Sequence, residues 1–235
     1  MKVVTSVKED SLLAIAGGIK DSALRENVIS MLRAPTLSLI DTEGAQYTAF
    51  AKSPASKRRH HSYATGLVVH TYSTAKIALC LSDIIEEVYG VKVDRDTVIA
   101  AALLHDLFKH VTYNEVYPGK YASSRLGERL DHMSLIIGEL YARKFPLDVI
   151  HAVAAHHGEN SPIEPRTLEA LVVHLADNTD ATMNDKVFFA AKDILRECLG
   201  AELQTLSREV SPFKVVAAKK EGGCDEVRRK FSGMV

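Results

Sequence analysis

The sequence predicts an all-α protein, and three observations support that prediction. Apolar residues recur at i, i+3 and i+4 over most of the chain, which places them on one face of a helix. Glycine, proline and aspartate stand where such helices would begin or end. Hydrophobic residues make up 46% of the 235 residues, enough for a substantial core and too many for wholesale disorder.

The first half of the chain contains three predicted helical regions. Residues 11–32 have helical spacing with an interruption at Gly17-Gly18, and Pro35 ends the pattern. Residues 37–51 are ambiguous between a loop and a short helix, and the polar, basic stretch 53–61 is expected to be irregular. A long amphipathic helix is predicted from Tyr63 to Gly90. The next helix is expected to be capped by Asp94 or Asp96 and to run to about Lys109.

The second half begins with residues 111–129, which are predicted to form a long loop. Asp131 is expected to cap a helix through Tyr141, and another helix is predicted to start at Pro146 or Asp148 and to end at His157-Gly158. Two further helices are predicted over residues 168–183 and 185–206. Residues 213–216 are expected to form a short strand, a break is expected at Gly222-Gly223, and residues 225–231 are expected to form one or two helical turns.

These elements suggest one core domain with two additions. We predict a helical N-terminal extension over residues 1–55, a core over 56–206 and a C-terminal tail of uncertain structure over 207–235. Lys and Arg number 29 against 30 Asp and Glu, which argues against binding of long nucleic-acid duplexes by bulk charge.

The cysteines and the apolar runs bear on location. The three cysteines, Cys80, Cys198 and Cys224, form no CxxC pair, so a disulfide framework or a zinc knuckle is not expected and a reducing cytoplasm fits best. The N-terminus lacks a signal-peptide apolar stretch, and no run reaches the roughly 18 apolar residues that a membrane span needs.

The histidines are concentrated in the middle of the chain. All ten lie between His60 and His174. Such a local supply of imidazoles predicts a metal site or general acid–base chemistry. The strongest motif there is His105-Asp106 at the end of an apolar helix, because adjacent helical side chains project about 100° apart and can serve one ion or bridge two. Alone, the dipeptide is a weak signal, because it arises by chance in many proteins and a capping histidine beside a surface aspartate at a helix end also explains it.

Two further helices each offer one such group. His70 lies within an apolar helix, and Asp177 ends the apolar run that begins at Leu171. Singly, His70 is better explained as a hydrogen-bonded core histidine and Asp177 as a carboxylate at a helix end. A shared metal ion explains all four groups together, since burying them without partners is costly.

The order His70, His105-Asp106, Asp177 resembles the HD superfamily of metal-dependent phosphohydrolases. The resemblance covers roughly residues 60–185. The stretches 53–71, 155–159 and 165–181 look like the 3′–5′ exoribonuclease branch of that superfamily. It implies an HD-domain helical bundle and, where two ions are bound, additional histidine ligands at His132 and His156, with His157 as a substitute or an addition. RNA-acting members of that branch carry an N-terminal oligonucleotide-binding barrel, for which residues 1–55 are too short and too helical.

The resemblance predicts metal-dependent cleavage of a phosphoester or phosphodiester bond in a nucleotide or short oligoribonucleotide. Mixed imidazole and carboxylate ligands suit one or two Mn²⁺, Fe²⁺, Co²⁺, Ni²⁺ or Zn²⁺ ions. With two ions Asp106 would bridge them, and the ions would activate water for attack on phosphorus. Lys109, at i+4 from His105, is predicted to bind phosphate or orient Asp106, although a lysine favoured by the helix dipole is an equal alternative.

The remaining assignments concern substrate. His61 is predicted, with Asp106 and Lys109, to be catalytic, and either His60 or His61 is expected to protonate the leaving group or contact a phosphate. The residues predicted to bind substrate are Lys57, Arg58, Arg59, His60, Lys109 and Arg125. Solvated basic residues in a plain loop are the competing explanation for the basic run 57–59.

Two other functions remain open at this stage. A mixed-valent diiron oxygenase of the same fold would use iron at this site, but Lys109 and the basic loop argue against it. A regulatory module that binds metal and nucleotide without turnover is disfavoured because the ligand set is complete. The expected partner is a nucleotide or short RNA substrate. No membrane association is expected, and formation of a homo-oligomer is left open.

Overall fold

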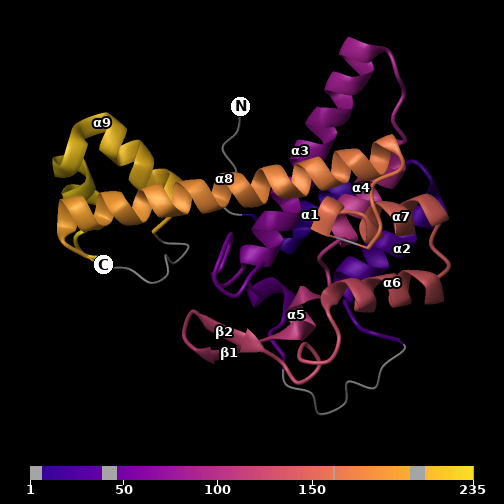
Figure 1. The fold of residues 1–235 in the computed structure, drawn as a ribbon, viewed down its shortest axis with the longest axis horizontal. Coiled ribbons are helices and arrows are strands. Elements are labelled where there is room, and N and C mark those ends of the chain that lie inside the picture. Colours follow the sequence, from indigo (N-terminus) through magenta and orange to yellow (C-terminus); the bar gives the residue numbers. More distant parts are fainter. Residues whose placement is uncertain (1–6, 39–46, 161, 202–209, 235) are drawn as a thin grey trace.

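The structure, a computed structural model, describes residues 7–38, 47–160, 162–201 and 210–234. The regular structure of the described chain is helical apart from one two-stranded hairpin, which confirms the predicted all-α class (Figure 1). None of its helices combines the length and the apolar character that crossing a bilayer requires.

The N-terminal helices follow the predicted punctuation. Helices α1 (Glu9–Ala16) and α2 (Ser22–Arg33) are separated at Gly17-Gly18, and the Asp21 carboxylate caps α2 by accepting a hydrogen bond from Leu24 N. A 3₁₀ turn, η1 (Phe50–Lys52), leads into the irregular segment before α3 (Gly66–Tyr89). Of the ambiguous stretch 37–51, residues 39–46 lie outside the described part.

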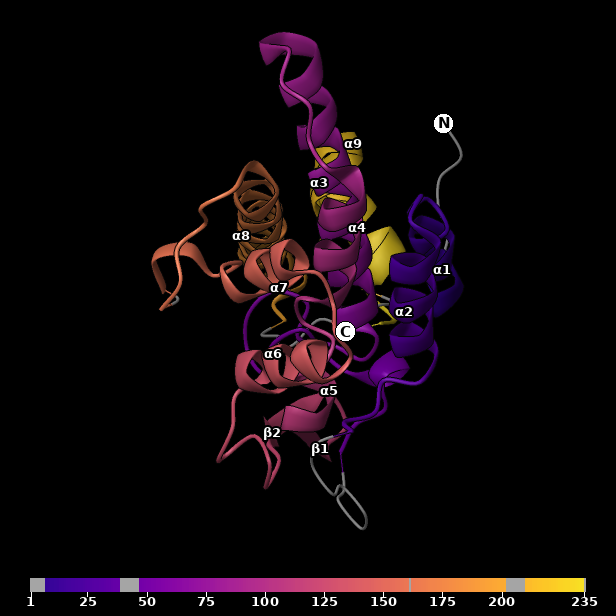
Figure 2. The ribbon, with the colours of Figure 1, turned by 90° about the vertical axis from the view of Figure 1, so that its right-hand side faces the viewer.

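Helix α4 (Arg95–Leu104) forms the centre of the core. Asp94 caps it as predicted, and every residue from Thr97 to Leu104 is buried. It packs against α1, α2, α3, α7 and α8. Figure 2 shows α1 and α2 on one side of α3 and α4, with α7 and α8 on the other. The end of α4, where His105 and Asp106 follow, therefore lies inside the bundle.

The predicted loop over residues 111–129 is wrong in part. It contains the end of the short helix α5 (Lys109–Thr112) and an antiparallel hairpin of β1 (Tyr113–Tyr117) and β2 (Lys120–Ser123). Tyr113 pairs with Ser123, and Gly119, with φ of 73°, makes the turn. Glycine adopts this left-handed conformation without steric cost, which allows two short strands to pair where the composition indicates only a loop.

Three helices complete the sequence up to residue 199. Asp131 caps α6 (His132–Ala142), and Pro146 precedes α7 (Leu147–Ala154), as predicted, but α7 ends before the expected His157-Gly158. A second 3₁₀ turn, η2 (Gly158–Asn160), follows α7. The two helices predicted over 168–183 and 185–206 are wrong, because α8 (Leu168–Leu199) is continuous. Asn184, which reads as a break in the sequence, accepts a hydrogen bond from His61 N instead; residues 202–206 lie outside the described part.

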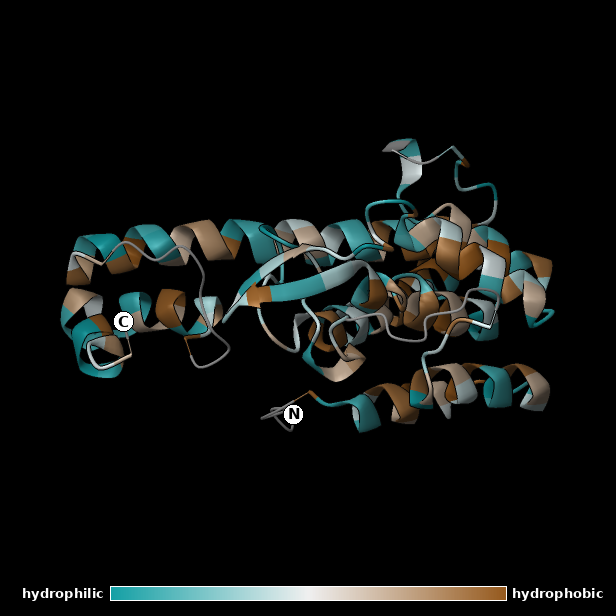
Figure 3. Cartoon of the chain, turned by 90° about the horizontal axis from the view of Figure 1, so that it is seen from below, coloured by the Kyte–Doolittle hydropathy of each residue, from teal (hydrophilic) through white to brown (hydrophobic). Residues whose placement is uncertain are grey.

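The C-terminal residues form an arm with its own small core. Helix α9 (Pro212–Phe231) lies along the far end of α8, and its Gly222-Gly223 kink confirms the predicted break (Figures 1 and 3). The strand predicted at 213–216 is wrong, since these residues begin α9, where Val215 and Ala218 pack toward α8. The arm core contains Ala191, Leu195, Cys198, Val210, Val215, Ala218, Val227 and Phe231.

A disulfide joins the two helices of the arm, contrary to the expectation from cysteine spacing. Cys198 near the end of α8 is bonded to Cys224 in α9, with a Cα–Cα distance of 5.0 Å. Spacing along the chain did not indicate the pair because only the return of α9 along α8 brings the two residues together. Cys80 is free and exposed.

Candidate metal centre

Four of the predicted ligands converge from three helices, and we call them the first ligand group: His70, His105, Asp106 and Asp177. Their ligand atoms all lie within 4.8 Å of one another. His70 Nε2 is 3.0 Å from Asp177 Oδ1 and 3.3 Å from Asp106 Oδ2. His70 comes from α3, His105-Asp106 from the end of α4 and Asp177 from α8, so the packing of the bundle assembles the group.

A second ligand group lies beside the first and consists of Asp106, His132, His156 and His157. His132 is the first residue of α6, and His156 and His157 follow α7. Asp106 Oδ1 is 3.2 Å from His132 Nε2 and 3.7 Å from His156 Nε2. Asp106 thus turns one carboxylate oxygen toward each group, which is the arrangement of a carboxylate between two ions.

Hydrogen bonds orient three of the imidazoles. The Nδ1 atoms of His105 and His156 lie 2.9 Å and 2.7 Å from the carbonyl oxygens of Ala102 and Val153. A carbonyl oxygen can only accept, so each Nδ1 carries the proton and each Nε2 keeps its lone pair for a metal. His70 Nδ1 lies 2.7 Å from Asp180 Oδ2 and follows the same rule.

Buried atoms without hydrogen-bond partners indicate that the groups fit a cation. Asp106 Oδ1, His132 Nε2 and His156 Nε2 are buried and have no such partner. Burying polar atoms in this way is costly unless something binds them. All three belong to the second ligand group and face one another, so a divalent ion there would satisfy them together.

The electrostatics of the first ligand group also fit binding of a cation. Burial lowers the pKa of His105, but Asp106 and Asp177 outweigh it and raise the pKa to about 9. Burial also opposes protonation of His70, yet its bonds to Asp106, Asp177 and Asp180 raise its pKa well above the usual value. Protons on these imidazoles therefore balance the carboxylates in the ion-free chain, and binding of a cation would displace them.

Two imidazoles of the second ligand group, His132 and His157, have lowered pKa values. Burial and the neighbouring His156 lower the pKa of His157 to about 3. Burial lowers the pKa of His132 as well, although Asp106 opposes this. Neutral imidazole is the form that binds metal, so these side chains are ready ligands at neutral pH.

Lys109 lies within the site, although it is not on a continuous helix with His105. It begins α5, is buried, and places Nζ 2.6 Å from Asp106 Oδ2. Burial lowers its pKa, but Asp106 outweighs this effect and the pKa is raised. Lys109 is therefore a buried cation in contact with Asp106, and its two predicted roles, phosphate binding and orientation of Asp106, stay predictions.

The predicted substrate-binding residues Lys57, Arg58, Arg59 and Arg125 lie outside both ligand groups. Lys57 Nζ donates a hydrogen bond to Ser123 Oγ at 2.9 Å and lies 5.9 Å from the centre of the Tyr113 ring. Arg58, Arg59 and Arg125 are exposed, and no described contact ties them to either ligand group. The hairpin, which the sequence did not indicate, is what positions Lys57.

His60 and His61 differ in what their ring nitrogens contact. His61 is buried, with Nδ1 2.8 Å from Tyr63 Oη and Nε2 2.9 Å from Asp180 Oδ2. His60 Nε2 is buried without a hydrogen-bond partner, and the His60 ring centre is 5.1 Å from that of His70. Burial and the nearby charges of His70 and Lys109 lower the pKa of His60 to about 3. This geometry argues against a catalytic role for His61 and leaves His60 with the available nitrogen.

A cavity of about 530 Å³ opens beside the ligands. It is lined by His156, His157, Glu159, His174, Asp177, Asn178 and Ala181. His174 Nδ1 donates to the carbonyl of His156, and a Cβ on Gly158 would lie 2.3 Å from the His174 ring. Sequence reasoning missed Glu159, Asn178 and Asp180, although the i+3 spacing from His174 through Asp177 to Asp180 is visible in the sequence.

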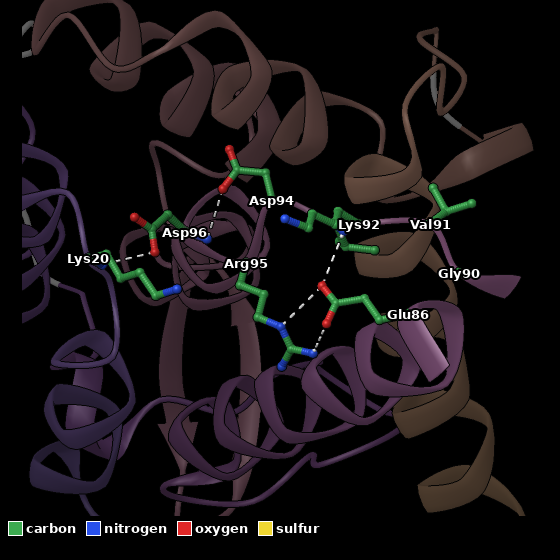
Figure 4. A pocket seen from close by; sticks show the side chains of 9 residues that line it. Lys20, Glu86, Gly90, Val91, Lys92, Asp94, Arg95 and Asp96 are labelled. Carbon is green, nitrogen blue, oxygen red and sulfur yellow. Dashed lines mark hydrogen bonds and ion pairs between the residues drawn. The ribbon is translucent and has the colours of Figure 1, made fainter. Parts of the chain in front are cut away.

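A separate hollow of about 580 Å³ lies at the other ends of α3 and α4 (Figure 4). The charges of Arg95 and Asp96 in this hollow have partners within the chain. Arg95 binds Glu86 and Asp83, and the Asp96 carboxylate accepts hydrogen bonds from the backbone of Lys20 and Asp21. These contacts fasten the start of α4 to α3 and to the turn before α2.

Comparisons with known proteins agree with this geometry. The HD domain family matches residues 67–182. The dihydroneopterin 2′,3′-cyclic phosphate phosphodiesterase of Methanocaldococcus jannaschii is 40% identical over 217 residues, which cover 91% of this chain and 85% of that protein. The 3′-5′ exoribonucleases YhaM of Bacillus subtilis and Shouchella clausii are each 31% identical, over 57% and 58% of this chain and 44% of their own length. No solved structure shows a significant match.

Proposed function

The chain belongs to the HD-domain family of metal-dependent phosphohydrolases, and from that premise we propose that it hydrolyses the cyclic phosphodiester of a small nucleotide-like molecule. The class of substrate that we favour is a 2′,3′-cyclic phosphate attached to a heterocycle. The 40% identical relative, which matches 91% of this chain, is named for a reaction of that class.

The position of Asp106 carries the proposal. Its Oδ2 is 3.3 Å from His70 Nε2 in the first ligand group, and its Oδ1 is 3.2 Å from His132 Nε2 in the second. Two adjoining sets of ligands that share one buried carboxylate are suited to a pair of ions on one phosphate. Neither an ordinary core nor a single-ion site requires this arrangement.

We assign the first ligand group to one ion and the second to another. Bound there, divalent ions would stabilise negative charge on the phosphate oxygens and lower the pKa of a water molecule to about 7. The imidazole and carboxylate donors favour Mn²⁺, Fe²⁺, Co²⁺, Ni²⁺ or Zn²⁺.

We propose that Lys109 and His60 are the two side chains, apart from the metal ligands, that lie near the bound phosphate. Lys109 holds Asp106 in place and adds a buried positive charge beside it. His60 is neutral because its pKa is lowered, its ring lies beside that of His70, and its buried Nε2 has no hydrogen-bond partner. In the Nε2–H form it can donate one hydrogen bond to a phosphate oxygen. Of the three basic loop residues, Lys57 is the one whose side chain has a described contact with the hairpin, at Ser123 and the Tyr113 ring.

The reaction opens the ring without a further reactant. The oxygen of water forms a bond to phosphorus, one ribose-type C–O–P bond breaks at phosphorus, and the proton passes to the leaving oxygen. The product is a phosphomonoester with a free hydroxyl. We place the organic part of the substrate in the 530 Å³ cavity, where Glu159 and Asn178 offer hydrogen-bond groups beside the ligands.

Short RNA is a weaker candidate for substrate. The exoribonuclease relatives match this chain over only 44% of their own length. Residues 7–38 of this chain form helices rather than a barrel that could hold a strand. We further propose a cytoplasmic location from composition, although the Cys198–Cys224 disulfide is an observation against it.

The proposal is tested by following phosphorus directly. The purified protein, loaded in turn with Mn²⁺, Fe²⁺, Co²⁺, Ni²⁺ and Zn²⁺, is given dihydroneopterin 2′,3′-cyclic phosphate, guanosine 2′,3′-cyclic phosphate, a 3′,5′-cyclic nucleotide and a short RNA. We expect ³¹P NMR spectra to show conversion of the 2′,3′-cyclic signal to that of a monoester. Chelation of the ions should stop it.

Two variants separate the site from the rest of the chain. His132→Gln removes a ligand of the second group and should abolish turnover, whereas Asp193→Asn, an exposed change on the same α8 that carries Asp177, should not affect it. Faster release of mononucleotides from RNA than opening of any cyclic phosphate would refute the substrate class. Absence of turnover with every ion and substrate would refute the proposal altogether.

A further inference from the structure

Asp180 is a buried carboxylate that the proposed reaction does not use. It lies one helical turn after Asp177 on α8 and is 2% exposed. Its Oδ2 accepts hydrogen bonds from His70 Nδ1 at 2.7 Å and from His61 Nε2 at 2.9 Å. A buried carboxylate at this depth is stable only with such partners.

Asp177 and Asp180 bind opposite edges of the same ring. Asp177 Oδ1 is 3.0 Å from His70 Nε2, while Asp180 Oδ2 is 2.7 Å from His70 Nδ1. One turn of α8 therefore holds the imidazole from both sides. With the Nδ1 proton directed at Asp180, the Nε2 lone pair is directed at the first ligand group.

The other partner of Asp180 anchors a loop. His61 adopts a φ of 47°, which is unfavourable for a residue with a side chain, and its backbone N donates to Asn184 Oδ1 at 2.8 Å. Gly66 passes so close to the His61 carbonyl that a Cβ would lie 2.0 Å from that oxygen. These contacts fix the segment that carries His60 against α3 and α8.

We infer that Asp180 is a positioning residue, which holds His70 in the Nδ1–H form required for metal binding and ties the His61 loop to that ligand. The assignment rests on the proposed metal-dependent function. Residues His61, His70 and Asp180 are also close enough to be considered as a third ion site. The two short hydrogen bonds account for their proximity without one, because His70 already directs its second nitrogen to the first ligand group.

The assignment predicts a loss of metal affinity when Asp180 is changed. Asp180→Asn keeps an oxygen acceptor but loses the charge, and Asp180→Ala loses both. Because groups behind a metal ligand typically contribute 10–100-fold to affinity, we expect about tenfold weaker binding of one ion for Asn and about 100-fold for Ala. Binding of Mn²⁺ and Zn²⁺ is measured by competition with a fluorescent chelator, and circular dichroism reports whether each variant is folded.

Asp193→Asn is the matched control, because it removes a carboxylate from the same helix where the side chain is 69% exposed. Its affinity should stay within about twofold of that of the unchanged protein, well below the typical contribution of a group behind a ligand. Excess metal should restore turnover in Asp180→Asn, which a purely structural loss would not allow. Asn and Ala variants that bind both ions with unchanged affinity would overturn the assignment.

A second measurement does not depend on a variant that folds. In the unchanged protein loaded with Zn²⁺, ¹⁵N-resolved NMR spectra of the histidine rings should show His70 protonated at Nδ1. Protonation at Nε2 would overturn the assignment. A protein that binds ions but opens no phosphate ester would end the proposed function and leave the role of Asp180 intact, whereas a protein that binds no ion would end both.

Discussion

Helix α8 passes through two regions that differ in where several of its polar side chains lie: inside the bundle in the first half and at the surface in the second. Its first half carries Asp177, Asp180 and Asn184 into the bundle, where they meet His70 and the His61 backbone. Its second half turns Ala191, Leu195 and Cys198 toward α9 and leaves its charges in exposed pairs such as Asp193–Arg196.

The difference shows which region is built for binding. The described part of the arm has a small apolar core, a disulfide and surface ion pairs that contribute little. The ligand groups leave buried atoms of Asp106, His132 and His156 without hydrogen-bond partners. We therefore expect a bound ion to stabilise the first half of α8 and to have little effect on the second half.

The largest effect should follow from changing Asp106, the residue shared by both ligand groups. Asp106→Asn keeps the shape but weakens both ion sites, and metal-assisted stabilisation of a phosphoryl transition state contributes several kcal/mol. At 1.36 kcal/mol per factor of ten, we expect kcat/KM to fall by about 1,000-fold. Glu197→Gln, an exposed change in the arm, is the control. Equal activities of the two variants would contradict the contrast between the regions.

Metal loading should stabilise the core and leave the arm unchanged. An ion present at about 1,000 times its Kd adds about 4 kcal/mol to the free energy of unfolding. For a chain of this size that raises the Tm by about 8–16 °C. Calorimetry with and without a chelator measures the shift, and hydrogen exchange locates it. Protection gained in α9 but not in α3 and α4 would reverse the comparison.

Removal of the disulfide should destabilise the arm and leave the metal-binding core unchanged. Cys198 and Cys224 are 26 residues apart, a loop for which a crosslink contributes about 3 kcal/mol. Cys224→Ser should therefore increase hydrogen exchange in α9 and the end of α8 without changing ion affinity. Cys80→Ser, at the free exposed cysteine, is the control. Loss of ion binding in Cys224→Ser would show that the arm supports the site.

The smallest effect concerns pH and the ion-free protein. The pKa of His105 is about 9 in the folded chain, above its unfolded value of about 6.5. The folded state then binds more protons than the unfolded state between these values, so stability is full below about pH 6.5 and is lost as pH rises toward 9. Denaturant unfolding should show a loss of about 2 kcal/mol between about pH 6.5 and 8. In the presence of Zn²⁺ the loss should disappear, because the ion takes the place of the proton; an equal loss with the ion would contradict this.

Local patterns account for most of the fold. Asp94 and Asp131 cap α4 and α6, as their positions in the sequence predict, and Gly90 ends α3 in the left-handed conformation. Such signals are readable because a cap, a turn or a helical face involves neighbours within four residues. Local patterns could not predict that α8 is continuous. The polar Asn184 lies inside it because its side chain accepts a hydrogen bond from the backbone N of His61, 123 residues earlier.

The sequence by itself determined the class of fold and the supply of ligands, since the helical period and the identities of His70, His105, Asp106 and Asp177 are properties of the chain. Only the tertiary structure decided which nitrogen of which histidine is available. His60 and His61 are adjacent in the sequence, yet both ring nitrogens of His61 contact Tyr63 and Asp180, whereas His60 Nε2 has no hydrogen-bond partner. The pairing of Cys198 with Cys224 was decided in the same way. Hydrogen bonds and crosslinks form between surfaces that meet only after packing, and no local pattern records which surfaces those will be.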